Sequence, residues 1–263
     1  MTAVDETPAN ARTSRWIRRF HPTDRARVRL VCLPHAGGSA TAYFPLSAAA
    51  EGQDFEVVAV QYPGRQDRRA EPCLDTVAAV ADAIAADLAG WSDLPVALFG
   101  HSMGATVGYE VARRLEARGT PPLGLFASAC RAPSAQRIEF IHQRDDDGLI
   151  AALKELSGTD AGVLGDDELL RMVLPAIRGD YTAVETYRHQ PGLEPSCPIQ
   201  VLVGDADPVT DLDEAGAWRD HTTGPCQVKT FPGGHFYLND QLDAVLKTIT
   251  TTLSGWQPGI YRG

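Results

Sequence analysis

Short apolar segments rich in β-branched residues alternate with helix-like segments along the first half of this chain, and that alternation restricts the fold more than any other feature. Residues 28–34, 55–63 and 95–100 end in Pro or Gly, as strands buried on both faces do. Residues 75–91 carry apolar side chains three and four positions apart, and residues 105–119 have the pattern of a helix that ends at its glycine. Strands joined by helical crossovers pair in parallel. The sequence therefore predicts an α/β fold with helices on both faces of a mostly parallel sheet.

The remainder of the chain predicts more strands and one long detour. Residues 123–130, 198–204 and 227–233 have strand character, and the Arg-rich stretch around Trp16 is typical of an edge strand, although it also loosely resembles a transit peptide. The connection from residue 134 to residue 197 is longer than an ordinary crossover and contains two segments with acidic starts and helical spacing. We expect one domain over residues 1–263, with a helical insertion at about 134–189.

Charge and composition exclude some classes of partner. The formal net charge is −10, from 34 acidic and 24 basic residues, which argues against nucleic acid because phosphate binding needs clustered Lys and Arg. The five cysteines contain no CxxC pair and suit reduced thiols. No apolar run approaches the roughly 18 residues that span a bilayer. We expect a cytoplasmic protein without a membrane partner.

A serine lies between two glycines at the point where an expected strand meets an expected helix. The stretch is Gly100-His101-Ser102-Met103-Gly104, which fits the G-x-S-x-G nucleophile motif in its required context. The turn is so tight that side chains two residues before and after the serine would collide with neighbouring backbone. It also projects the Ser102 hydroxyl above a helix N-terminus, which favours developing negative charge. Ser102 is therefore the candidate nucleophile.

A serine hydroxyl needs a base to accept its proton, and the base needs a group to orient it. His235 follows the last expected strand in a Gly-rich loop and is the candidate base. Asp205 and Asp207 both follow the strand at 198–204. We prefer Asp207 as the acid because it is placed to reach sideways towards the histidine loop, whereas Asp205 can hydrogen-bond the backbone of its own turn.

A tetrahedral intermediate needs backbone N–H donors for its oxyanion. Met103, the residue after the nucleophile, supplies one, and the Gly-rich loop at 34–40 supplies the other, for which Ala36 is the candidate. His35 and His101 lie near this chemistry, yet each is beside a strand end. We interpret both as structural histidines with satisfied hydrogen bonds.

The residues now described resemble a known family. RLVCLPHAGGSATAYFPL, VVAVQYPGRQDRR, ALFGHSMGATVGYEVARRL, VGDADPVT and FPGGHFYL are similar, in order and spacing, to segments of the stand-alone type II thioesterases of polyketide and nonribosomal peptide assembly lines, in the α/β-hydrolase superfamily. The resemblance covers about residues 14–253. It implies an α/β-hydrolase fold with Ser102, Asp207 and His235 as the triad, Ala36 and Met103 as oxyanion donors, and a mobile helical lid at 134–189.

The same resemblance implies a substrate and a partner. Such enzymes hydrolyse acyl groups from the phosphopantetheine arm of acyl or peptidyl carrier proteins, and so clear chains that block the synthase. The substrate carries the phosphopantetheine, and neither a metal nor a redox cofactor is expected. Carrier proteins of these pathways are typically acidic. We therefore consider Arg65, Arg68 and Arg69 as a docking cluster, with an ordinary solvated loop as the equal alternative.

Two further points stay open in the sequence. Gly158, Gly162, Gly165 and Gly179 are candidate hinges of the lid. A small-molecule serine esterase or an acyltransferase would share the triad, and an inactive binding protein of the same fold is a third alternative. The complete set of serine, aspartate and histidine argues against that last one.

Overall fold

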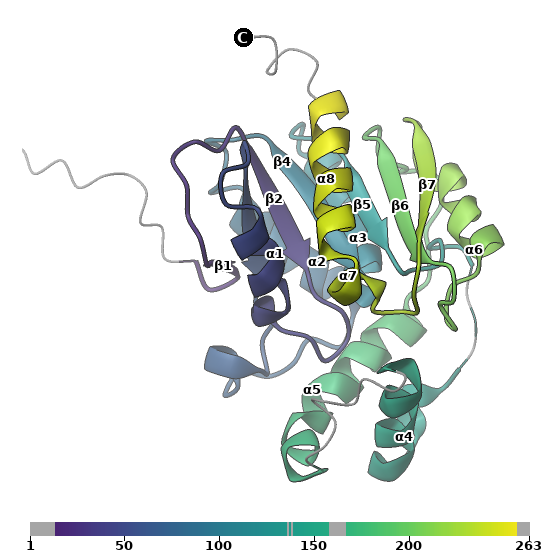
Figure 1. Ribbon diagram of the computed structural model, residues 1–263. Coiled ribbons are helices and arrows are strands. Elements are labelled where there is room, and N and C mark those ends of the chain that lie inside the picture. Colours follow the sequence, from purple (N-terminus) through teal and green to yellow (C-terminus); the bar gives the residue numbers. More distant parts are fainter. Residues whose placement is uncertain (1–13, 136, 138, 158–166, 257–263) are drawn as a thin grey trace, which may run out of the picture.

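A sheet with the strand order β1-β3-β2-β4-β5-β6-β7 forms the centre of the molecule (Figure 1). The computed structural model describes residues 14–135, 137, 139–157 and 167–256. β1 pairs antiparallel with β3, and every other neighbouring pair is parallel, which confirms the mostly parallel sheet and the N-terminal edge strand. The strands are β1 (Ile17–Arg19), β2 (Val28–Leu33), β3 (Phe55–Val60), β4 (Val96–His101), β5 (Leu125–Ser128), β6 (Ile199–Gly204) and β7 (Cys226–Phe231).

Helices cover both faces of this sheet, as the alternating pattern predicts. In Figure 1, α1 and α8 lie on the near face, and α2 and α3 lie behind the strands. The first amphipathic helix starts at Val77, where the Thr76 hydroxyl accepts a hydrogen bond from the Ala79 N–H at 3.2 Å. The helices are α1 (Phe44–Ala49), α2 (Val77–Leu88), α3 (Met103–Ala117), α4 (Asp146–Ser157), α5 (Asp167–Thr186), α6 (Leu212–Gly216), α7 (Tyr237–Asp240) and α8 (Leu242–Trp256).

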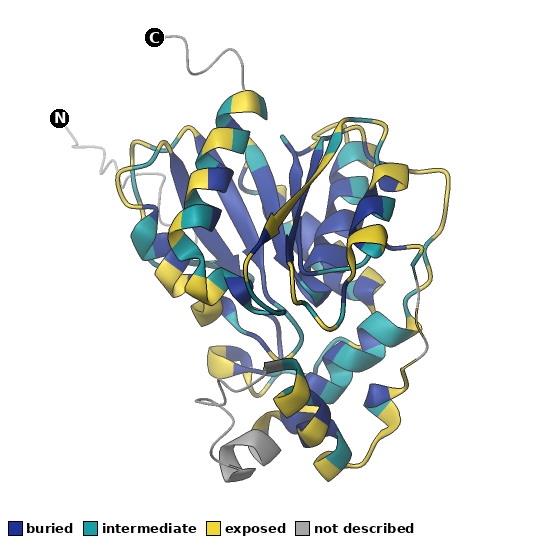
Figure 2. Cartoon of the chain, turned by 45° about the vertical axis from the view of Figure 1, so that its right-hand side comes forward, coloured by how far each residue is buried: buried dark blue, intermediate teal, exposed yellow. Residues whose placement is uncertain are grey.

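The strands are buried on both faces because alternate side chains enter two different cores. Val31 and Leu33 of β2 pack with α2 and α3, whereas Leu30 and Cys32 pack with α1 and α8. Figure 2 shows most of the sheet as buried, apart from the middle of the edge strand β7. The two apolar cores, one on each face of the sheet, therefore hold the carboxyl ends of the parallel strands in place. No helix in the described ranges is long and apolar enough to cross a membrane.

The expected helical insertion lies between β5 and β6 and contains α4 and α5. It extends beyond the carboxyl ends of the strands (Figure 1) and has a small apolar core of its own, made by Ile141, Leu149, Ile150, Ala152, Leu174 and Ile177. Gly158, Gly162 and Gly165 lie outside the described residues. Gly179 lies inside α5, where an added Cβ would be 3.2 Å from the Cys73 Cβ, so this expected hinge is instead a position of close packing.

Candidate active site

The turn around Ser102 has the tight geometry that its two glycines predict. Ser102 adopts φ 54° and ψ −121°, in the left-handed half of the backbone map, between the end of β4 and the start of α3. A Cβ added at Gly100 would lie 2.1 Å from the Gly104 carbonyl oxygen, and one at Gly104 would lie 2.0 Å from the Leu33 carbonyl oxygen. Only glycine fits either position. The half-buried Ser102 also donates its backbone N–H to the Ser128 carbonyl at 2.8 Å, which anchors the turn to β5.

The structure brings His235 and Asp207 into direct contact from two different loops. His235 Nδ1 lies 3.1 Å from Oδ1 and 3.0 Å from Oδ2 of Asp207, and both side chains are almost fully buried. Asp207 Oδ1 also accepts the Val209 N–H at 2.8 Å. Because the carboxylate can only accept, it holds the proton of a neutral imidazole on Nδ1 and leaves Nε2 as the free acceptor.

The neighbouring aspartate has a different set of contacts. Asp205 Oδ1 accepts the Gly233 N–H at 3.0 Å, and its own N–H donates to the Phe231 carbonyl at 2.8 Å. Asp205 therefore ties the histidine loop to the loop after β6, which is the backbone role that the sequence favours for it. Asp207, and not Asp205, faces the imidazole.

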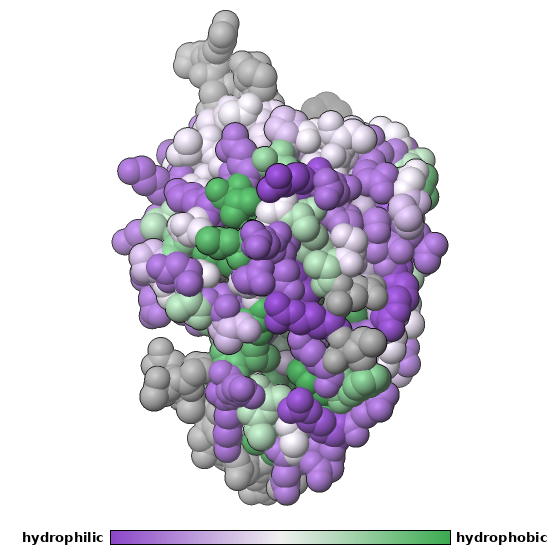
Figure 3. All heavy atoms as spheres, turned by 90° about the vertical axis from the view of Figure 1, so that its right-hand side faces the viewer, coloured by the Kyte–Doolittle hydropathy of each residue, from purple (hydrophilic) through white to green (hydrophobic). Residues whose placement is uncertain are grey.

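Ser102 and His235 line one cavity of about 330 Å³ between the sheet and the insertion. The wall on the insertion side includes Leu156, Tyr181 and Val184. Figure 3 shows apolar surface where the insertion meets the body of the molecule. Within the described part of the chain no hydrogen bond joins the Ser102 hydroxyl to His235. Such contacts are often long without substrate and shorten in its complex.

The two expected oxyanion donors lie in the serine turn itself and in the loop after β2. Met103 is the first residue of α3, where backbone N–H groups have no partner within the helix, and it lines the cavity. Ala36 lies in the loop after β2 and is not among the residues that line this cavity. That loop begins against the serine turn, since a Cβ at Gly104 would be 2.8 Å from the Pro34 carbonyl oxygen.

The loop that contains Ala36 is held by residues whose function the sequence did not predict. Gln61, Tyr62 and Arg65, from the QYPGR stretch after β3, each hydrogen-bond its backbone. Asp180 of α5 accepts the Gly37 N–H at 2.7 Å. The QYPGR stretch stands out in the sequence, but nothing around Asp180 signals this contact.

The interpretation of His35 and His101 as satisfied structural histidines holds only in part. His101 Nδ1 lies 2.9 Å from the Ser128 hydroxyl, which in turn contacts the Tyr237 hydroxyl at 2.7 Å. The buried His101 Nε2, however, has no hydrogen-bond partner among the described residues. Burial lowers the pKa of His101 well below its usual range, and burial followed by the charge of His235 lowers the pKa of His35 to about 4. Both imidazoles are therefore neutral at pH 7.

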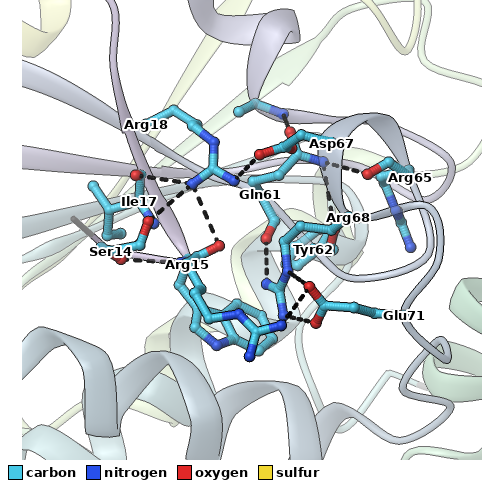
Figure 4. A network of polar contacts seen from close by, with 12 residues as sticks. Ser14, Arg15, Ile17, Arg18, Gln61, Tyr62, Arg65, Asp67, Arg68 and Glu71 are labelled. Carbon is cyan, nitrogen blue, oxygen red and sulfur yellow. Dashed lines mark hydrogen bonds and ion pairs between the residues drawn. The ribbon is translucent and has the colours of Figure 1, made fainter.

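The three arginines considered as a docking cluster do not form one exposed group. Arg65 and Arg68 are buried, and of the three only Arg69 is exposed. Figure 4 shows Arg68 directed to the Gln61 carbonyl and, through two hydrogen bonds of 3.0 and 2.7 Å, to Glu71. An open polar groove of about 570 Å³ lies beside these residues, and no member of the expected triad lines it.

Comparison with known proteins places this chain in a family. The sequence profile of the Thioesterase domain family matches residues 28–253. Thioesterase PikA5 of Streptomyces venezuelae is 50% identical over 252 residues, which are 95% of this chain and 89% of that protein. A "Probable cadicidin biosynthesis thioesterase" of Streptomyces griseus is 52% identical over 254 residues, 96% of this chain and 68% of that protein.

A solved structure agrees with these relatives. The type II thioesterase BorB from the borrelidin biosynthetic cluster matches with a TM-score of 0.87 and 49% identity, covering 93% of this chain and 100% of that one. The expected α/β-hydrolase fold is thereby confirmed. The chain belongs to the thioesterase family and is a thioesterase of the type found in polyketide and nonribosomal peptide pathways.

Proposed function

We propose that this thioesterase hydrolyses acyl groups from the phosphopantetheine arm of acyl or peptidyl carrier proteins, and so edits a polyketide or nonribosomal peptide synthase. Ser102 is the nucleophile, His235 the general base and acid, and Asp207 the group that orients the histidine. The amides of Ala36 and Met103 bind the oxyanion. The names of the relatives, which are biosynthesis thioesterases, support the substrate class.

One observation carries the assignment of the residues. Both oxygens of the buried Asp207 carboxylate face His235 Nδ1, while the imidazole and Ser102 share one cavity. This arrangement leaves His235 Nε2 ready to accept a proton from a hydroxyl in that cavity. The nearby Asp207 charge stabilises the imidazolium that results.

The chemistry follows in two balanced steps. In the first, the Ser102 hydroxyl proton moves to His235 Nε2 as Oγ bonds to the thioester carbonyl carbon, and the two amides bind the oxyanion. The C–S bond then breaks, and the pantetheine sulfur leaves as a thiol with the proton from His235. In the second step His235 takes a proton from water, hydroxide adds to the acyl carbon, and the C–O bond to Ser102 breaks as His235 returns the proton to Oγ.

The insertion supplies the acyl wall of the site. Leu156, Val184 and Ile141 give apolar surface to the cavity that Ser102 also lines. We propose that this insertion at residues 134–189 acts as a lid that moves to admit the acyl arm. We also propose a cytoplasmic location, which suits a carrier-protein partner and the five free cysteines, since thiols stay reduced there.

A paired assay tests this proposal. Fluorophosphonate should label the wild type at Ser102 and fail to label Ser102→Ala. The carrier-bound acyl thioester should then be hydrolysed with a higher kcat/KM than the same acyl group on N-acetylcysteamine. Equal kcat/KM values for the two substrates would contradict the carrier partner, and labelling of Ser102→Ala would contradict the nucleophile.

A further inference from the structure

A buried ion pair outside the proposed triad joins the insertion to the body of the enzyme. Asp180 of α5 is 3% exposed and Arg65, after β3, is 6% exposed. Arg65 donates from Nη1 to Oδ2 at 2.6 Å and from Nη2 to Oδ1 at 2.8 Å. Burying two charges costs desolvation that their attraction often only offsets, so the pair calls for an explanation other than stability.

The third contact of this pair points to a function. Asp180 Oδ2 also accepts the Gly37 N–H, at 2.7 Å, and Gly37 adjoins Ala36, the proposed oxyanion donor. Arg65 Nη1 donates to the Gly38 carbonyl at 3.1 Å. The ion pair therefore holds the loop at two backbone groups, the Gly37 N–H and the Gly38 carbonyl.

The backbone of this loop forms a tight turn with a defined orientation. The Gly38 N–H donates to the His35 carbonyl at 2.9 Å, and Gly37 has φ 76°, as the third residue of a type II turn requires. The His35 carbonyl and the Ala36 N–H belong to one peptide plane and point in opposite directions. Fixing the carbonyl inside the turn therefore directs the Ala36 N–H outwards.

Asp180 determines which way the next peptide plane faces. The Gly37 N–H belongs to the central peptide of the turn, whose orientation distinguishes a type II turn from a type I turn. Its bond to the carboxylate holds the type II form. α5 adds a steric contact, because a Cβ at Gly37 would lie 2.8 Å from the Ile177 Cγ1.

We propose that Asp180 and Arg65 are positioning residues that hold the turn at residues 35–38 so that the Ala36 N–H faces the oxyanion. This inference rests on the proposed function, because it takes Ala36 as an oxyanion donor. It fixes the α5 part of the insertion at Asp180, so the lid movement proposed for residues 134–189 leaves this contact in place. The carboxylate acts through the turn and does not touch the substrate.

The test uses Asp180→Ala, which removes the bond to the Gly37 N–H together with both bonds to Arg65. We expect kcat on an acyl thioester to fall about 10- to 100-fold, somewhat less than the loss of a whole oxyanion donor, with KM changed less than about threefold. Affinity for an alkyl trifluoromethyl ketone, which forms a tetrahedral adduct with the nucleophilic serine, should fall by the same factor as kcat.

Glu56→Gln is the matched control. Glu56 is another buried carboxylate that pairs with arginines, Arg19 and Arg29, but it lies near the amino end of β3, away from the site. Its variant should lose thermal stability while kcat and ketone affinity stay at wild-type values. Arg65→Lys, which keeps the charge without the paired N–H groups, should reproduce the kcat loss of Asp180→Ala and serves if that variant fails to fold.

The outcomes separate this inference from the proposed function. If the folded Asp180 or Arg65 variant keeps kcat and ketone affinity within twofold of the wild type, the pair is only structural and the inference is wrong. If Ser102→Ala still turns over, or the wild type does not form the ketone adduct at Ser102, the proposed function itself fails.

Discussion

Exchanging Asp207 for asparagine should nearly abolish turnover while leaving the shape of the site intact. The amide oxygen can still accept the Val209 N–H, which Asp207 accepts at 2.8 Å, so the loop keeps its anchor. With Oδ1 held by the Val209 N–H, the amide nitrogen takes the place of Oδ2, which is the oxygen nearer to His235 Nδ1, at 3.0 Å against 3.1 Å for Oδ1. Two donors cannot share that contact, so the imidazole proton moves to Nε2 and can no longer accept the Ser102 proton.

The expected loss is about 10⁴-fold in kcat, equivalent to about 5 kcal/mol of transition-state stabilisation. The matched variant is Asp205→Asn, whose Oδ1 can still accept the Gly233 N–H that Asp205 accepts at 3.0 Å. It should lose less than about tenfold. Single-turnover hydrolysis of an acyl-carrier thioester measures both, with circular dichroism to verify that each variant is folded.

A reversed order of the two losses would mean that Asp205 is the acid. Similar small losses in both variants would mean that neither carboxylate orients His235 during the reaction. Either result would refute the tautomer argument, because that argument requires the contact at Nδ1 to be the one that matters.

Three other expectations test separate parts of the account. His235→Ala and Ser102→Ala should each lower kcat by about 10⁴- to 10⁶-fold, and the double variant should be little worse, since the pair acts as a unit; additive losses in steady-state assays would contradict this. Gly104→Ala should lower the free energy of unfolding by more than about 3 kcal/mol in urea titrations, because its Cβ would lie 2.0 Å from a carbonyl oxygen, whereas Gly255→Ala, with open space around it, should change little. Burial lowers the pKa of His221 from 6.5 to about 4. The neutral imidazole therefore contributes at most about 3 kcal/mol to the free energy of unfolding above pH 6.5, and this contribution is lost as the pH falls towards 4. A midpoint of urea unfolding that does not change between pH 7 and pH 4.5 would contradict that.

Local patterns in the sequence were sufficient to predict the sheet and the serine turn. Periodicity predicts β2, β3 and β4 within a few residues because the burial of both faces leaves a continuous apolar run. The spacing of Gly100 and Gly104 predicts their steric role because both collisions arise within one strand–turn–helix unit. The relation of Asp207 to His235 was also predictable, since each residue follows a strand at the same edge of the sheet.

Contacts between distant segments could not be predicted in the same way. PGRQDRR has the composition of a solvated loop. Its Arg65, however, pairs with the Asp180 carboxylate of α5, 115 positions further along the chain. Arg68 packs its guanidinium 4.4 Å from the centre of the Trp16 ring. Whether an arginine is exposed therefore depends on partners that no local pattern identifies.

The most direct test of the central claim is to capture the acyl group on the enzyme. An acyl-carrier thioester is mixed with the wild type, the reaction is stopped with acid within the first turnover, and the intact mass and peptide masses are measured. The account predicts an added acyl group on the peptide that contains Ser102, and none in Ser102→Ala. Free acid released by the wild type with no acyl-enzyme at any early time, or an acyl group on another residue, would contradict it.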